Sequence, residues 1–314
     1  MSTIRFSLVT PTFNRASTLK RMLQHLHTVD GINGCEVIII NDGSTDGTDE
    51  VLADYLQAMP KLLRVITLSN GGPARARNTG VEAAKNERIL FIDDDVFPHP
   101  DMLYQHWNML DNGYDGSQGI LLWHQEIAVT PLIRYIDSRG SQFAFEQIEH
   151  PEDLGSEHIY TGNFAVRRDA VLQAGGFCER LFDHELAFSA FEDTMLGCSM
   201  KKKGARLGLN RKAVADHLHH MSETGYLRRE YNVGSGVAQL EKLFPEITQH
   251  LGLKPRGSFI SLQVGLLRIV NALPGLRHVI GYQASMRMRH RASFLRGYRR
   301  YEKEYSMGKE RPTA

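Results

Sequence analysis

The residues most suited to chemistry in this sequence are three consecutive aspartates, Asp93, Asp94 and Asp95. Adjacent carboxylates repel one another, so such a cluster is costly unless a cation neutralises it. The aspartates directly follow an apolar run at residues 89–92, which predicts a strand that ends at them. Oxygen ligands of this type suit Mg²⁺ or Mn²⁺ bound together with substrate phosphates. We therefore predict a divalent metal site, the alternative being an acidic turn on the surface.

Three further polar segments have the composition of ligand-binding loops. The carboxylate of Asp42 can accept hydrogen bonds from a nucleobase or a ribose, whereas Asp46 and Thr48 are equally well placed to cap a helix. A Gly-Gly-Pro turn before a predicted helix leaves backbone N–H groups that favour phosphate, and Arg77 with a second arginine adds charged donors. The alternative is three solvated loops. The segments are residues 10–15 (TPTFNR), 41–48 (NDGSTDGT) and 71–78 (GGPARARN).

Regular alternation of short apolar runs and helical patterns must position these segments. The runs are at residues 6–9, 37–40, 63–68 and 89–92, and the helical patterns at 17–27, 48–57, 74–84 and 101–110. This alternation predicts βαβ units with a buried parallel sheet, whose ligands bind at the carboxyl ends of the strands. We expect residues 123–160 to be irregular, a strand at 161–166, helices from about 169 and over 191–203, and only helices after residue 226.

Composition and charge exclude several classes of protein. The 314 residues are 42% hydrophobic and 23% charged, with a net charge of +1, as in an ordinary globular protein. Three cysteines without a CxxC motif argue against a disulfide scaffold or a zinc site. The first residues do not resemble a signal peptide, and no uncharged apolar run reaches 18 residues. We therefore expect a cytoplasmic protein.

The C-terminal part is strongly basic, with ten Lys or Arg and no Asp or Glu in residues 254–300. One reading is peripheral contact with anionic lipid at the inner face of the cell membrane, or with a lipid-phosphate-linked acceptor. The other is a helical hairpin packed on the rest of the chain or on a second subunit, as in a homo-oligomer. We expect no nucleic acid partner, because no binding motif accompanies the charge. One apolar helical face is expected at Leu262, Leu266, Ile269, Val270 and Leu273.

In order and spacing, the four polar segments resemble the family 2 glycosyltransferases, over residues 7–220. The resemblance implies an α/β fold of the GT-A type: a Rossmann-like, mostly parallel central sheet flanked by helices, here with a C-terminal helical extension. Asp93-Asp94-Asp95 looks like the DXD motif of the family, with Asp95 binding the metal and Asp93 at the ribose or a metal-bound water. The remaining donor-binding residues that it implies are Thr10, Pro11, Asn14, Asp42, Arg77 and Asp94.

Later segments extend the resemblance to the acceptor side. Residues 161–168 resemble the segment that closes the sugar and acceptor pocket, which implies acceptor contacts at Gly162 and Asn163. Residues 175–179 and 191–193 resemble the GGF-E and ED region of the family. The resemblance implies that Asp193 is the general base, and Glu192 is the fallback assignment. The alternative role of Asp193 is to cap the N-terminus of a helix. Three histidines cluster at 217–220, and His217 best fits a metal ligand.

The implied reaction is inverting, metal-dependent transfer of a sugar from a nucleotide-diphosphate donor, with UDP favoured, to a hydroxyl of a glycan or a lipid-linked saccharide. We predict a catalytic domain at 1–222, with a nucleotide-binding half (1–122) and an acceptor half (123–222), and a basic helical extension at 223–314. A sugar-phosphate nucleotidyltransferase is the main rival, but it requires a glycine-rich, lysine-containing loop that residues 10–15 do not supply. An inactive nucleotide-sugar-binding module would have a broken DXD motif or lack a base.

Overall fold

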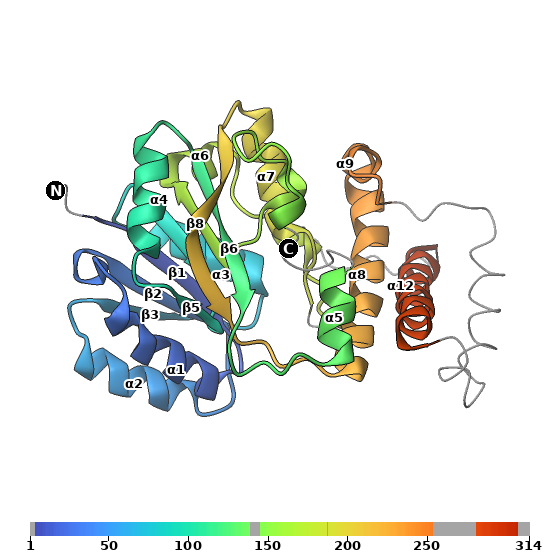
Figure 1. Cartoon of the computed structure of the whole chain (residues 1–314), viewed down its shortest axis with the longest axis horizontal. Helices are drawn as coiled ribbons and strands as arrows, with labels where there is room; N and C mark the ends of the chain where they lie inside the picture. The colour runs from blue at the N-terminus through green and yellow to red at the C-terminus, as the bar shows by residue number, and fades with distance from the viewer. Residues whose placement is uncertain (1–3, 139–144, 187, 254–280, 307–314) are drawn as a thin grey trace. The chain divides into compact units, whose positions relative to one another are not determined.

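The computed structural model describes residues 4–138, 145–186, 188–253 and 281–306 (Figure 1). The chain divides into two compact units. The sheet unit consists of Met1–Ile127, Phe143–Glu179 and Glu192–His219. The helical unit consists of Ala128–Gln142, Arg180–Phe191 and His220–Ala314. The second unit thus includes two internal segments that we had expected in the catalytic domain, in addition to the C-terminal part.

The sheet unit is built on eight strands in the order β3-β2-β1-β4-β7-β6-β8-β5. Its first four strands are mutually parallel and correspond to the four predicted apolar runs. The β-branched side chains of β1, β2 and β4 are buried on both faces of the sheet, as helices on both sides require, whereas those of the edge strand β3 are partly exposed. These strands are β1 (Ser7–Thr12), β2 (Glu36–Asn41), β3 (Leu63–Thr67) and β4 (Arg88–Ile92).

The other half of the sheet is mixed. Strand β7 (Asn163–Arg167) runs antiparallel to β4 and to β6 (Gly116–Trp123). Strand β8 (Leu207–His217) is parallel to β6 and antiparallel to the short β5 (Val96–Pro98). The register pairs Val96 with His217, which brings the chain just after the aspartate cluster beside the predicted histidine ligand.

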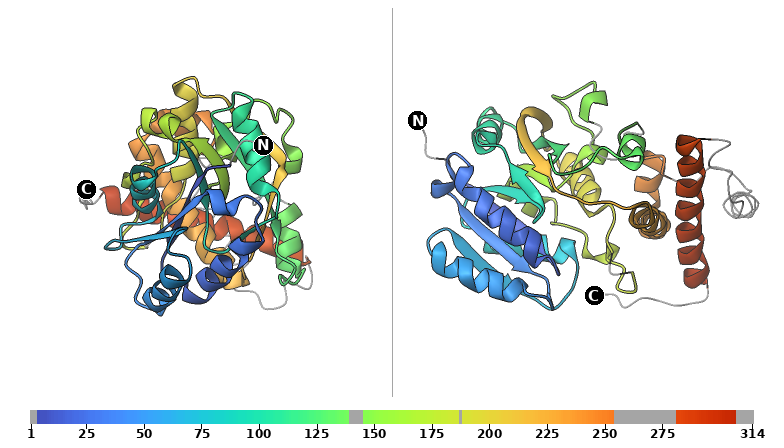
Figure 2. Two further views of the ribbon diagram at one scale, coloured as in Figure 1. Left: turned by 90° about the vertical axis from the view of Figure 1, so that its left-hand side faces the viewer. Right: turned by 60° about the horizontal axis from the view of Figure 1, so that its bottom comes forward.

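Helices of the sheet unit follow the strands as predicted, with ends displaced by one or two residues. Helices α1 and α2 lie side by side (Figure 2). Helix α3 packs closely on β1, because a Cβ at Gly80 would lie 2.3 Å from Val9 Cγ1. The helices are α1 (Ala16–His25), α2 (Thr48–Ala58), α3 (Pro73–Ala83), α4 (Met102–Asp111), α6 (Arg168–Gln173) and α7 (Glu192–Lys202).

The helical unit contains α5 (Pro131–Ser138), α8 (Glu223–Leu243), α9 (Pro245–His250) and α12 (Tyr282–Ser306). Helices α8 and α12 touch through their backbones, since a Cβ at Gly297 would lie 1.7 Å from Tyr231 O. The expectation of irregular chain throughout 123–160 was wrong at α5, whose apolar residues at 132, 133, 135 and 136 form one buried face. The predicted apolar face at 262–273 lies outside the described residues. Within the described parts of the chain, no helix is long and apolar enough to span a membrane.

Candidate metal and donor site

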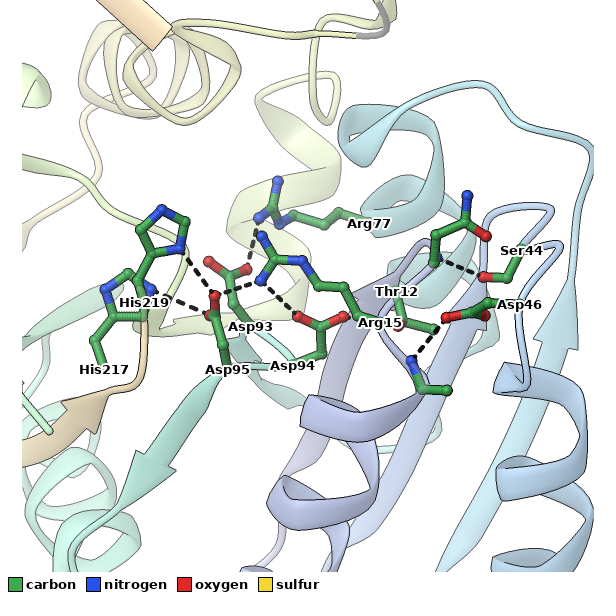
Figure 3. Close-up of polar contacts among 12 residues, drawn as sticks. Thr12, Arg15, Ser44, Asp46, Arg77, Asp93, Asp94, Asp95, His217 and His219 are labelled. Carbon is green, nitrogen blue, oxygen red and sulfur yellow. Dashed lines mark hydrogen bonds and ion pairs between the residues drawn. The ribbon is translucent and has the colours of Figure 1, made fainter. Parts of the chain in front are cut away.

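The three aspartates follow β4 at the edge of the sheet where β1 and β2 also end (Figure 3). Asp94 and Asp95 are buried, whereas the side chain of Asp93 is 35% exposed. Thr12, the last residue of β1, donates its hydroxyl to Asp94 Oδ2 at 2.7 Å. Strand ends that are distant in sequence thus converge on these carboxylates, as a parallel sheet predicts.

Asp95 forms a cluster with two histidines. His217 Nε2 lies 3.2 Å from Asp95 Oδ1, and His219 Nδ1 lies 3.4 Å from Asp95 Oδ2. One ligand atom from each residue falls within 4.8 Å of the others, so the three could hold one metal ion. A carboxylate with two imidazoles is a donor set that fits a divalent first-row metal. His219 was not in our predicted set, although its i+2 spacing from His217 places both rings on one side of an extended chain.

Burial and charged neighbours shift the pKa values of the two buried aspartates in opposite directions. Burial alone would raise the pKa of Asp95, but hydrogen bonds from His217 and His219 and the charge of Arg15 hold it well below its usual range. Burial raises the pKa of Asp94 to about 7, and its aspartate neighbours add to the effect of burial. Arg15 contacts both carboxylates, at 3.3 Å from Asp94 Oδ1 and closer still to Asp95 Oδ2. Arg15 ends the first predicted loop, at residues 10–15, but was not among the predicted site residues.

Arg77 connects the aspartate cluster to the predicted catalytic pair. Its guanidinium is buried and donates to Asp93 Oδ1 at 2.9 Å and to Glu192 Oε1 at 3.3 Å. Because α3 carries Arg77 and α7 begins at Glu192, one side chain fixes the start of α7 beside the carboxylates. Our expectation that Arg77 approaches the donor stays a prediction, and its observed partners are these two acids.

Asp193 lies in the first turn of α7, so it is not the N-cap residue of that helix. Its carboxylate accepts a hydrogen bond from Thr194 N at 2.9 Å. Burial raises its pKa to about 7, the negative charge of Glu192 adds to this, and the charge of Arg77 opposes it. A carboxylate with this pKa can accept a proton near neutral pH.

Asp42 holds the Gly-Gly-Pro loop through backbone groups. Its two carboxylate oxygens accept hydrogen bonds from Gly71 N at 2.9 Å and Gly72 N at 2.8 Å, and Asn70 Nδ2 is 3.2 Å away. Burial raises its pKa, because these two hydrogen bonds offset the loss of solvent only in part. Base recognition by Asp42 stays a prediction, and its observed contacts define the loop that precedes α3.

The first predicted loop, residues 10–15, includes both buried and accessible residues among those expected to bind the sugar donor. Thr10 has a fully buried side chain within β1, and Pro11 pairs with Ile40 of β2. Asn14 has a left-handed backbone conformation, at φ 54°, and its Oδ1 accepts a hydrogen bond from Thr45 N at 2.7 Å. This bond ties the loop after β1 to the loop after β2. The donor roles of the three residues stay predictions.

The two predicted acceptor residues differ in their surroundings. A Cβ at Gly162 would lie 3.3 Å from Asp93 Oδ2, so this glycine lies directly against the aspartate cluster. Asn163 is fully buried, and its amide donates to Ile120 O and Ala213 O, both at 3.0 Å. Its Oδ1 is 2.8 Å from Nε2 of His106, whose pKa burial lowers to about 4. Asn163 therefore joins β6, β7 and β8 and leaves no amide hydrogen for an acceptor.

The fold and the site together define a class of protein: an α/β protein with a carboxylate–histidine cluster that could hold a metal ion, and with two arginines bound to carboxylates, at the carboxyl edge of its sheet. The sequence matches the family model described as glycosyl transferase family 2 over residues 7–175. The chain belongs to this family, so the predicted family membership is confirmed.

Individual relatives agree with this assignment. The Pre-mycofactocin glycosyltransferase of Mycobacterium tuberculosis is 27% identical over 250 residues, which cover 78% of this chain and 49% of that protein. Other curated glycosyltransferases, from Bacillus subtilis and Escherichia coli, are matched over 30% and 28% of their length. The chain thus spans about half or less of these relatives.

Solved structures share the fold. The mannosyltransferase PcManGT from Pyrobaculum calidifontis, in complex with GDP-Man and Mn²⁺, superimposes with a TM-score of 0.62 at 16% identity, over 98% of this chain and 88% of that one. S. aureus TarS 1-349 in complex with UDP-GlcNAc gives 0.55 at 18% identity, over 98% and 93%. The predicted GT-A fold is therefore confirmed.

Proposed function

We propose that the protein transfers a sugar from a nucleoside-diphosphate sugar to a hydroxyl of a glycan or a lipid-linked saccharide, with inversion at the anomeric carbon. The observation that carries the proposal is the placement of Asp193 and Glu192 beside the aspartate cluster, through Arg77. This arrangement supports the proposal, because the candidate proton acceptor and the candidate metal site then lie at the same edge of one sheet. A transferase that activates an acceptor hydroxyl and stabilises a diphosphate leaving group needs both.

The metal would be held by Asp95, His217 and His219, which together offer one oxygen and two nitrogen ligands. A mixed donor set suits Mn²⁺ better than Mg²⁺, whose protein ligands are almost always oxygen atoms. A bound divalent ion would stabilise the negative charge of the diphosphate group. The structural neighbours PcManGT and GalNAc-T7 were solved with Mn²⁺, which supports the same ion here.

The acceptor hydroxyl would lose its proton to Asp193 as its oxygen forms a bond to the anomeric carbon. The bond from that carbon to the diphosphate oxygen breaks on the opposite side, so configuration inverts in one displacement. Asp193 is the better base because Glu192 is ion-paired with Arg77 at 3.3 Å. The raised pKa of Asp193, about 7, matches a base that works near neutral pH.

The donor would lie along the loops after β1, β2 and β3. The hydrogen bonds of Asp42 to Gly71 N and Gly72 N fix the loop at the start of α3, where a helix N-terminus favours phosphate. We favour a UDP-sugar, as the family resemblance implies. TarS in complex with UDP-GlcNAc supports this choice, and PcManGT in complex with GDP-Man supports the alternative base.

A screen of nucleotide sugars by thermal shift tests the donor and the metal together. We expect one donor class to raise the melting temperature, and only with Mn²⁺. The expected stabilisation at a ligand concentration 100 times the Kd is about 2.7 kcal/mol. An Asp95→Asn variant is the control and should lose the metal-dependent part. If no nucleotide sugar stabilises the protein with or without metal, the proposed function is wrong.

The rival enzyme and the inactive binding module give different results in a turnover assay. A nucleotidyltransferase would release pyrophosphate from a nucleoside triphosphate and a sugar phosphate. An inactive module would bind the donor in the thermal-shift screen, yet release no nucleoside diphosphate with any acceptor. A transferase releases nucleoside diphosphate only when an acceptor hydroxyl, or water at a slow rate, is present.

We also propose that the helical unit contacts anionic lipid, either a membrane surface or a lipid-linked acceptor. Helix α12 carries seven Lys or Arg and two Glu. A pocket of about 840 Å³ in this unit has five basic residues and one acidic residue in its lining. It is lined by Tyr231, Lys242, Arg296, Arg299, Arg300, Glu302, Lys303, Tyr305 and Ser306. Clustered basic side chains of this kind attract phosphate head groups.

Flotation with liposomes tests this contact. We expect binding to vesicles that contain phosphatidylglycerol, none to phosphatidylcholine alone, and release at high salt. An Arg296→Glu/Lys303→Glu variant should not bind. The matched control is Lys61→Glu/Lys212→Glu, which makes the same charge change at exposed positions of the sheet unit. If the protein does not float with anionic vesicles, and scattering shows a dimer instead, the helices serve self-association.

A further inference from the structure

Arg15 contacts the carboxylates that would hold the metal. Its Nη1 lies 3.3 Å from Asp94 Oδ1 and forms a shorter contact with Asp95 Oδ2 (Figure 3). The same oxygen of Asp95 lies 3.4 Å from His219 Nδ1. The arginine thus donates to an oxygen atom of the group that could coordinate an ion.

The backbone on both sides of Arg15 is fixed, whereas its side chain can leave. Asn14 N donates to Ser44 Oγ at 3.0 Å, and Ala16 N donates to Asp46 Oδ2 at 3.1 Å. The side chain of Arg15 itself is 41% exposed. The guanidinium can therefore move into solvent by rotation about its own bonds, without any change in the sheet or in α1.

A metal ion and this guanidinium are mutually unfavourable at Asp95. Both are cations, and both would contact the same buried carboxylate, where solvent screens their repulsion less than at a surface. In the protein as observed, Arg15 supplies positive charge to the Asp94–Asp95 pair, whose burial would otherwise be costly. A divalent ion that used Oδ2 of Asp95, the oxygen beside His219, would have to share it with Arg15.

We propose that Arg15 is an internal counterion that competes with the divalent metal for Asp95. The inference rests on the proposed metal site, and it assigns Arg15 a positioning role. The competition weakens metal binding to the protein alone. A nucleoside diphosphate brings negative charge that offers the displaced guanidinium another partner, so nucleotide and metal bind with positive coupling. By linkage, each then raises the affinity for the other by the same factor.

The experiment measures Mn²⁺ affinity by the EPR signal of the free ion, with and without UDP. Without UDP, the Arg15→Gln variant should bind Mn²⁺ more tightly than the wild type, because the competing cation is removed. We expect a gain of roughly tenfold and no more, since solvent weakens Coulomb repulsion at a partly exposed site. The gain in affinity caused by UDP should be smaller in Arg15→Gln. Arg15→Lys keeps the charge and should bind Mn²⁺ more weakly than Arg15→Gln.

A matched control separates this local effect from net charge. Arg21→Gln makes the same charge change six residues further along the chain, within α1, where Arg21 pairs with Glu126 at 2.7 Å. We expect its Mn²⁺ affinity to stay within about twofold of the wild type, because exposed charges at a distance are screened. If Arg15→Gln binds Mn²⁺ no more tightly than Arg21→Gln, the competition does not exist. If no variant binds Mn²⁺ even with UDP, the proposed metal site fails together with it.

Discussion

Two buried aspartates at the same edge of the sheet, Asp42 and Asp95, satisfy their carboxylates in opposite ways. Asp42 is held by the backbone N–H groups of Gly71 and Gly72. Asp95 is instead surrounded by the side chains of Arg15, His217 and His219. Asp42 and Asp95 are equally buried, at 3% exposure each, yet the pKa of Asp42 is raised and that of Asp95 is lowered.

The difference indicates which carboxylate can exchange its partners. Backbone donors cannot leave Asp42 unless the loop itself rearranges, so we expect Asp42 to affect a ligand mainly through the loop that it holds. Around Asp95, by contrast, the partly exposed guanidinium of Arg15 can rotate away, and the two imidazoles could serve as co-ligands, so we expect Asp95 to be able to take a metal. The same residue type at the same edge of the sheet thus holds a loop in one case and belongs to a candidate metal cluster in the other.

The largest expected effect comes from Asp95→Asn. Loss of the charge removes the group that would anchor the metal, so Mn²⁺ affinity should fall below detection and sugar transfer by about 10³-fold. EPR titration and initial rates of nucleotide release measure the two. Asp54→Asn, at an exposed aspartate of α2, should retain both Mn²⁺ affinity and transfer rate. If Asp95→Asn bound Mn²⁺ normally, Asp95 would not be the metal ligand, and it would not differ from Asp42 in the way we infer.

Asp193→Asn should lower transfer by roughly 10²–10⁴-fold and leave donor and Mn²⁺ affinity unchanged. The wild-type rate should depend on pH, because only the ionised carboxylate accepts a proton. With a pKa of about 7, raised by burial and by Glu192, the rate should increase tenfold per pH unit below 7 and level off above it. A pH profile that is flat from 5 to 8 would exclude Asp193 as the base.

His219→Gln tests whether the second imidazole belongs to the metal site. We expect Mn²⁺ affinity to fall about 10- to 100-fold, the loss typical of a residue that supports or completes a metal site. His220→Gln is the matched control, one residue further along the chain, and should bind Mn²⁺ as the wild type does. Equal losses in both variants would show that the effect is not specific to the cluster around Asp95.

Asp42→Asn should have the smallest effect on turnover. It replaces one carboxylate oxygen by an amide that faces backbone N–H donors, so the free energy of unfolding should fall by about 1–3 kcal/mol. The KM for the donor should rise about tenfold while kcat changes little, because the loop is displaced and the base is intact. Steady-state kinetics and denaturant unfolding check the two parts. Loss of kcat with a normal KM would place Asp42 nearer to the chemistry than we infer.

The sequence predicted the parts of this molecule that depend on local pattern. The parallel strands from β1 to β4 and the aspartate cluster follow from apolar runs and the residues that end them, and each is encoded within a few positions. The family resemblance extended this to Asp193 and Gly162. Asp193 lies beside Glu192, and Gly162 lies against Asp93. Both roles stay predictions, and the Asp193→Asn variant tests the first.

Contacts across the fold were not predictable in the same way. Arg15 and His219 are polar residues in loops, and only the pairing of β5 with β8 and the turn after β1 bring them to Asp95. Asn163 matched the resemblance, yet the antiparallel course of β7 buries its amide between strands. Helix α5 was missed although its apolar residues share one face, because its eight residues are fewer than the window of about 11–18 residues over which such a period is normally judged.

The division into two units has a practical consequence for work with shortened chains. The chain crosses from one unit to the other five times, after residues 127, 142, 179, 191 and 219. A protein that ends at residue 222 would retain α5 without α8 and α12, and α5 has a buried apolar face that includes Tyr135, in ring contact with Tyr226. Such a fragment would expose this face and tend to aggregate. Activity should therefore be measured on all 314 residues rather than on a fragment. The chain returns to the sheet unit after residue 191, directly before Glu192 and Asp193 at the start of α7.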